Sequence, residues 1–196
     1  MKIPDEFPNQ FESKGYFIFD EFLNEAQTKM VRSEMLSLQN SSLFRKAGIG
    51  KQEEFRIDSN ERGDFILWIE PEKAPPATTL FIEKITDLMR QFNRLFYMGI
   101  KEYECHYAIY PERTFYKKHV DRHHKSSPRI VSFVFYLNEN WKEDHGGQLR
   151  IYEDEENSFD VGPEAGRLVV FLSEKEHEVL VTTQKRMSIT GWMLNE

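Results

Sequence analysis

Tyr116-Lys-Lys-His-Val-Asp121 is the stretch around which the rest of the chain can be placed. If this segment is an extended strand, its side chains alternate between two faces, so His119 and Asp121 share a face and can hold one cation together. A His-x-Asp tripeptide is short enough to arise by chance, so its meaning depends on the residues that accompany it.

Short strands separated by turns are expected on both sides of this stretch, from Lys101 onward. The turns come at intervals of roughly 8 to 12 residues, which is typical of a β-sandwich or barrel. The expected strands lie near Tyr103–Tyr110, Phe115–His119, Arg129–Leu137, Gly147–Ile151, Arg167–Leu172, His177–Val181 and Arg186–Met193. Ligands of such barrels bind in the mouth.

A second histidine completes the candidate metal site. His177 lies in a later expected strand, in Glu-Lys-Glu-His-Glu-Val-Leu-Val. Two histidines and one carboxylate on one face of an octahedral iron leave three positions open for substrate and dioxygen. We therefore take His119, Asp121 and His177 as candidate iron ligands.

Arg186 follows His177 by nine residues and adds a fixed positive charge. In a strand, alternation turns Arg186, Ser188, Thr190 and Trp192 to one face and the apolar side chains between them to the other. A guanidinium held in this way suits a dicarboxylate co-substrate.

The first half of the chain is expected to supply the supporting helices. Gly15–Phe22 predicts a short aromatic strand, and Asn24 with Gln27 predicts the start of the helix that follows it. Phe65–Glu70 predicts a buried strand. A long amphipathic helix is expected from about Thr79, with Gly99 as its C-terminal cap.

Ser41–Asp64 is polar and has no sustained period. A segment of this length is more often a lid or binding loop than a plain connection, although a disordered surface insert has the same composition. Arg62 and Asp64 can pair across the turn that ends it. Exposed pairs of this kind contribute less than ~1 kcal/mol.

The length of 196 residues corresponds to about one domain. We predict a single domain over 1–196, with helical support over about 15–100 and a β-barrel core over about 101–194. The fold class is a β-dominated α+β arrangement.

The net charge and the cysteine content limit which classes of partner and which cellular compartment we expect. The net charge of −7 argues against nucleic acid as an obligatory partner. The single cysteine, Cys105, excludes an intramolecular disulfide and fits a reducing compartment. We expect it to be buried rather than reactive. No apolar run of membrane length or signal-like start is present, so we expect no membrane partner and a cytoplasmic protein.

With these residues in place, the chain resembles the iron(II)- and 2-oxoglutarate-dependent dioxygenases, and among them the prolyl 4-hydroxylase domain proteins. The resemblance extends over roughly residues 15–192. Its matching blocks are Asp20-Glu-Phe-Leu23, Arg62-Gly-Asp-Phe-Ile-Leu-Trp-Ile-Glu70, Tyr110-Pro111, His119-Val-Asp121, Tyr136-Leu-Asn-Glu-Asn-Trp141, Gly146-Gly-Gln-Leu-Arg150, His177-Glu-Val179 and Arg186 to Trp192.

The resemblance implies a double-stranded β-helix of the jelly-roll, cupin-like type with helices packed on one side. It implies Fe(II), with 2-oxoglutarate and O2 as co-substrates, and it is compatible with ascorbate. Arg186 would bind the C5 carboxylate of 2-oxoglutarate, with Tyr136 as a hydrogen-bond donor and Thr190 nearby. Pocket-lining roles are implied for Tyr110, Tyr116, Arg129 and Trp192, and the Ser41–Asp64 loop with Arg62 and Asp64 would close over substrate.

Two departures from the resemblance bear on the substrate. His106 lies on the face of Tyr110, where better-known animal members carry an apolar side chain. The loop after Asp121 carries His123 and His124, which could compete as ligands. A solvated turn is favoured for them, because His119 alone has the partner spacing of a facial triad.

The expected activity is 4-hydroxylation of a prolyl residue in a protein or peptide. We expect the enzyme to be a monomer or weak dimer. Oxygen sensing is among its expected roles. One alternative is a dioxygenase of the same fold acting on a small molecule or a nucleobase; nucleobase demethylases carry a second arginine that 187–196 lacks. A non-catalytic module that binds a peptide or 2-oxoglutarate is a further alternative. A zinc hydrolase is disfavoured, because its reaction would give Arg186 and Tyr136 no role.

Overall fold

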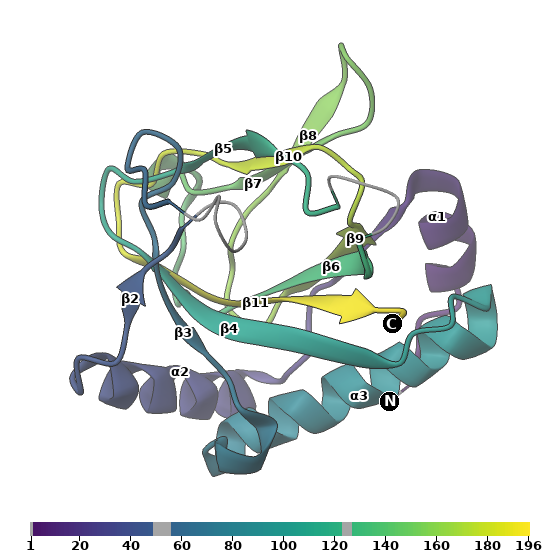
Figure 1. The fold of residues 1–196 in the computed structure, drawn as a ribbon, viewed down its shortest axis with the longest axis horizontal. Coiled ribbons are helices and arrows are strands. Elements are labelled where there is room, and N and C mark those ends of the chain that lie inside the picture. The colour runs from purple at the N-terminus through teal and green to yellow at the C-terminus, as the bar shows by residue number, and fades with distance from the viewer. Residues whose placement is uncertain (1, 49–55, 123–126) are drawn as a thin grey trace.

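Two antiparallel sheets face each other, and the helices cover the outer side of the larger one (Figure 1). The computed structural model describes residues 2–48, 56–122 and 127–196. The seven-stranded sheet has the order β1 (Tyr16–Phe19), β9 (Leu168–Leu172), β6 (Arg129–Tyr136), β11 (Arg186–Leu194), β4 (Glu102–Tyr110), β3 (Phe65–Trp68), β2 (Arg45–Lys46). The four-stranded sheet has the order β5 (Tyr116–His119), β10 (His177–Val179), β7 (Leu149–Tyr152), β8 (Ser158–Val161).

This arrangement is the predicted double-stranded β-helix with helices on one side. Three strands of the larger sheet, β1, β2 and β3, come from the first 100 residues, so the helical part of the chain also contributes to the β core. None of the helices in the described ranges has both the length and the apolar character needed to span a bilayer.

The described helices are α1 (Phe7–Lys14), α2 (Glu25–Gln39) and α3 (Pro76–Phe96), with short 3-10 turns at Pro71–Lys73 and Glu143–His145. The predicted start of α2 is confirmed, because the Asn24 side chain accepts a hydrogen bond from the Gln27 amide and the Gln27 side chain accepts one from the Asn24 amide. The predicted cap of α3 is wrong. Tyr97, with φ 53°, takes the left-handed position that was assigned to Gly99.

Alternation along β4 separates the helix-facing core from the site. Tyr107 and Ile109 pack with α3 in the main core, whereas Ala108 and Tyr110 face Val179 of the opposite sheet. Cys105 is on the helix side and 2% exposed, and burial raises the pKa of its thiol to about 12. The expectation that Cys105 is buried is therefore confirmed.

Several features of the fold were not expected. No prediction covered β8, which has only four residues and follows an acidic stretch, or α1, which is short and polar apart from Phe7 and Phe11. The strand predicted at Phe65–Glu70 ends at Trp68 and is half-buried, because only the two-residue β2 covers its outer edge.

Candidate active site

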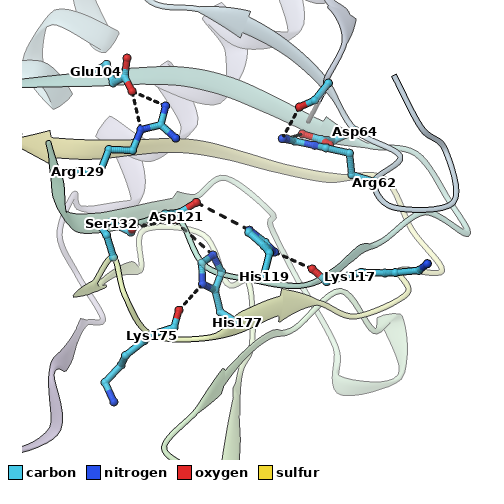
Figure 2. Close-up of polar contacts among 12 residues, drawn as sticks. Arg62, Asp64, Glu104, Lys117, His119, Asp121, Arg129, Ser132, Lys175 and His177 are labelled. Atoms are coloured by element: carbon cyan, nitrogen blue, oxygen red, sulfur yellow. Dashed lines mark hydrogen bonds and ion pairs between the residues drawn. The ribbon is translucent and has the colours of Figure 1, made fainter. Parts of the chain in front are cut away.

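The three predicted metal ligands meet between the two sheets (Figure 2). His119 ends β5 and His177 begins β10, and the two residues stand directly opposite each other in the antiparallel pair. Asp121 follows β5, with its Oδ1 3.9 Å from His119 Nε2 and its Oδ2 3.5 Å from His177 Nε2. One ligand atom from each residue lies within 4.8 Å of the others.

Backbone carbonyls fix the protonation of both imidazoles. The Nδ1–H of His119 donates to the carbonyl oxygen of Lys117 at 2.7 Å, and that of His177 donates to the carbonyl of Lys175 at 2.9 Å. The lone pairs therefore lie on the two Nε2 atoms, as metal-ligating histidines require. Burial, with the neighbouring His177, lowers the pKa of His119 to about 3, which keeps this ring neutral.

The carboxylate of Asp121 is held by residues that the sequence analysis did not single out. Ser132 Oγ donates to Asp121 Oδ2 at 2.7 Å and is 2.9 Å from Ser173 Oγ. Burial alone would raise the pKa of Asp121, but His177, His119 and the Ser132 hydrogen bond outweigh it and lower the pKa. The available signal for Ser132 was its alternation with Val134 and Tyr136 on one face of β6.

Arg186 is a buried cation without an anionic partner among the described residues. It is 1% exposed, and its Nε donates to the Gly147 carbonyl at 2.8 Å. The rings of Tyr110 and Tyr136 lie 5.0 and 5.1 Å from the guanidinium carbon. The buried Tyr136 hydroxyl has no hydrogen-bond partner of normal geometry in the described structure, and burial raises its pKa, so it stays protonated.

This pocket suits a carboxylate. A buried guanidinium is costly unless it is paired, and a carboxylate can accept from both the guanidinium and the phenol. Thr190 lies two positions beyond Ser188 on the same face of β11, with the two hydroxyl oxygens 3.5 Å apart. The four residues predicted to hold a dicarboxylate, Arg186, Tyr136, Thr190 and Tyr110, thus face one region of the space between the sheets.

Arg62 and Asp64 form a buried ion pair beside Tyr116, so the expectation of an exposed pair is wrong. Asp64 is 1% exposed and accepts two hydrogen bonds, from Arg62 Nε at 2.7 Å and Nη2 at 2.6 Å. The guanidinium lies 4.3 Å from the Tyr116 ring centre, and Tyr116 stacks on His119 at 3.6 Å. The end of the polar segment is therefore connected to the candidate metal ligand His119 by stacked side chains.

A second ion pair, Arg129 with Glu104, lies on the other side of the site (Figure 2). Arg129 Nε donates to Glu104 at 2.8 Å, and its guanidinium stacks on Trp192 at 3.6 Å. Trp192 in turn lies beside Asp121 and helps to lower the pKa of that carboxyl group. Arg129 therefore packs against the indole that lies beside Asp121.

Some sequence expectations lie outside the described residues. These are the competing ligands His123 and His124, and the stretch 49–55 within the predicted loop.

Residues 105–194 match the model of the 2OG-Fe(II) oxygenase superfamily. The chain is 32% identical over 195 residues to the hypoxia-inducible factor prolyl hydroxylase of Caenorhabditis elegans, covering 93% of this chain and 27% of that protein. It is similar to the crystal structure of a Pseudomonas putida prolyl-4-hydroxylase, with 33% identity, a TM-score of 0.87 and coverage of 96% of this chain and 97% of that chain.

A Trichoplax adhaerens prolyl hydroxylase, solved in complex with a peptide fragment of the hypoxia inducible factor oxygen degradation domain, is also similar. Its identity is 29% and its TM-score 0.88, with coverage of 96% of this chain and 87% of that chain. The similarity therefore extends well beyond the residues of the metal site.

Proposed function

The chain belongs to the prolyl hydroxylases of the 2OG-Fe(II) oxygenase superfamily, and from this premise we propose that it 4-hydroxylates a prolyl residue in a protein or peptide. The reaction consumes 2-oxoglutarate and O2 and releases succinate and CO2. The observation that carries the proposal is the pairing of a two-histidine, one-carboxylate site with a buried arginine that lacks an anion among the described residues.

His119, Asp121 and His177 would hold Fe(II) through the two Nε2 atoms and one carboxylate oxygen. The donor set fits, because both Nδ1–H groups are already committed to carbonyls and nitrogen and oxygen donors suit this ion. Fe(II) supplies the redox chemistry with O2 that breaks an unactivated C–H bond. Ser132 would keep the Asp121 carboxylate in its orientation.

Arg186 and Tyr136 would bind the distal carboxylate of 2-oxoglutarate, with Thr190 and Tyr110 beside it. The guanidinium offers two parallel N–H groups to a carboxylate, and its Nε bond to Gly147 fixes their direction. Gly147 has φ +67°, and an added Cβ would lie 3.1 Å from Arg186 Cδ, so a side chain there would disturb this support.

Tyr116, Arg129 and Trp192 would line the substrate side, and the Arg62–Asp64 pair would support Tyr116. A prolyl ring is apolar and needs to be oriented and kept from bulk water, which aromatic walls do. The Pseudomonas putida and Trichoplax adhaerens proteins, which are named as prolyl hydroxylases, support this assignment of substrate class.

The proposal makes a spectroscopic test possible before the substrate is known. Anaerobic addition of 2-oxoglutarate to Fe(II)-loaded protein should give a weak visible charge-transfer band that His119→Ala abolishes and that Arg186→Ala shifts to higher co-substrate concentration. Absence of the band in folded, iron-loaded wild type would refute the site assignment. Peptides that gain one oxygen atom in a lysate supplied with Fe(II) and 2-oxoglutarate would then identify the substrate, and a gain on a residue other than proline would refute the proline assignment.

We also propose a cytoplasmic monomer or weak dimer that needs neither nucleic acid nor membrane. The single buried cysteine supports a reducing compartment, and the net charge of −7 argues against nucleic acid as a required partner. Ascorbate dependence and an oxygen-sensing role stay predictions, and the O2 concentration at half-maximal hydroxylation would test the latter.

A further inference from the structure

His106 is buried on the site-facing side of β4 and has no assigned role. It is 3% exposed and alternates with Ala108 and Tyr110, which face the opposite sheet. Its neighbours in register are Trp68 on β3 and Thr190 on β11. Two residues away on the same face, Glu104 anchors Arg129, so His106 lies in the wall of the same space as the metal ligands.

Two indoles enclose the imidazole. The His106 ring centre is 5.0 Å from that of Trp68 and 5.5 Å from that of Trp192. Trp68 is 48% exposed, whereas Trp192 is buried beside Asp121. The three rings therefore form a continuous wall from the protein surface to the metal site.

The imidazole has unused hydrogen-bonding capacity. Its buried Nδ1 makes no hydrogen bond with any of the residues that the structure describes. Burial is the main reason that the pKa of His106 is lowered to about 3. The carboxylates of Asp64 and Asp121 raise this pKa, and the guanidinium groups of Arg62 and Arg129 lower it. The ring is therefore neutral at physiological pH, with one nitrogen that donates and one that accepts.

None of the described residues gives the Nδ1 atom of His106 a structural hydrogen bond. A buried polar atom without a partner destabilises the fold, and an apolar side chain of similar size would pack between the two indoles without that cost. A ligand that supplies the missing partner would remove this cost.

We propose that His106 is a specificity residue that hydrogen-bonds an uncharged polar group of the substrate, a hydroxyl or an amide, beside the target proline. The inference rests on the proposed prolyl hydroxylation. An uncharged group fits because the surroundings hold two ion pairs whose charges are already balanced, Arg62 with Asp64 and Arg129 with Glu104. A site built to hydrogen-bond such a group discriminates strongly against substrates that lack it.

The test compares wild type with His106→Leu and His106→Asn on a library of peptides with a central proline and randomised flanking positions. Hydroxylation is measured by mass spectrometry in the presence of Fe(II) and 2-oxoglutarate. We expect wild type to prefer Ser, Thr, Asn or Gln at one flanking position. His106→Leu should lose that preference, with kcat/KM for the preferred peptides falling at least about fivefold, mainly through KM. Asn keeps a donor and an acceptor near Nδ1 and should retain part of the preference.

Two further measurements separate a substrate contact from a packing effect. His106→Leu should raise the melting temperature by a few degrees, because it removes the unpaired polar atom. Its charge-transfer band with 2-oxoglutarate should be unchanged. Cys105→Ala, on the opposite face of the same strand, is the control and should leave the peptide preference as in wild type.

If an active, folded His106→Leu keeps the peptide preference and a kcat/KM within twofold of wild type, this inference is overturned and the proposed function still stands. Failure of wild type to hydroxylate any library peptide, despite a normal charge-transfer band, would overturn the proposed function and this inference with it.

Discussion

Replacement of Arg186 by Lys tests how the co-substrate is held. Lysine keeps the positive charge but has neither the Nε bond to Gly147 nor two parallel N–H donors. A hydrogen bond to a charged group is worth ~1.5–3 kcal/mol, and one such bond to the carboxylate is lost. We therefore expect the KM for 2-oxoglutarate to rise roughly 10- to 150-fold.

The assay is succinate formation against 2-oxoglutarate concentration, together with anaerobic titration of the charge-transfer band. Arg150→Lys is the matched control, because Arg150 makes a two-point contact with Asp160 at 2.7 and 2.8 Å on the outer side of β7. This control should leave the KM unchanged. A KM within twofold of wild type for a folded, iron-loaded Arg186→Lys would refute the assigned role of the guanidinium.

Three other perturbations follow from the same contacts. Ser132→Ala removes the donor to Asp121 and should weaken Fe(II) binding about 10- to 100-fold in an anaerobic titration; unchanged affinity would mean that Ser132 does not position the ligand. Asp64→Asn leaves Arg62 buried without its counter-charge and should cost ~3–5 kcal/mol in chemical denaturation, whereas a loss under ~1 kcal/mol would indicate an effectively solvated pair. His106 has a pKa of about 3 when folded, so its unfolded form binds the extra proton and stability should fall as the pH drops below about 6.5, by ~1.4 kcal/mol at pH 5.5. In metal-free protein the pKa of His119 is also lowered to about 3 and adds its own loss, so His106→Leu should lose less stability than wild type by the contribution of His106 alone, and identical losses of stability in acid would contradict the prediction.

Local pattern was sufficient for much of the fold and the metal site. A strand alternates its side chains with a period of two, so the faces of His119 with Asp121 and of Arg186 with Thr190 follow from spacing alone. The Asn24 capping box is likewise decided by residues three apart. These predictions hold because the geometry that carries them spans only a few residues.

Contacts between segments that are distant in the sequence could not be predicted from local sequence patterns. The sequence contains Arg62, Tyr116 and His119, but only the fold stacks them together, and the same is true of Ser132 against Asp121 and of the Gly147 carbonyl against Arg186. The burial of Arg62 and Asp64 was predicted wrongly because it depends on what packs over the pair. The sequence by itself determined which residues share a face of each strand, whereas the tertiary structure decided which faces meet, because strand pairing is set by long-range packing and not by local periodicity.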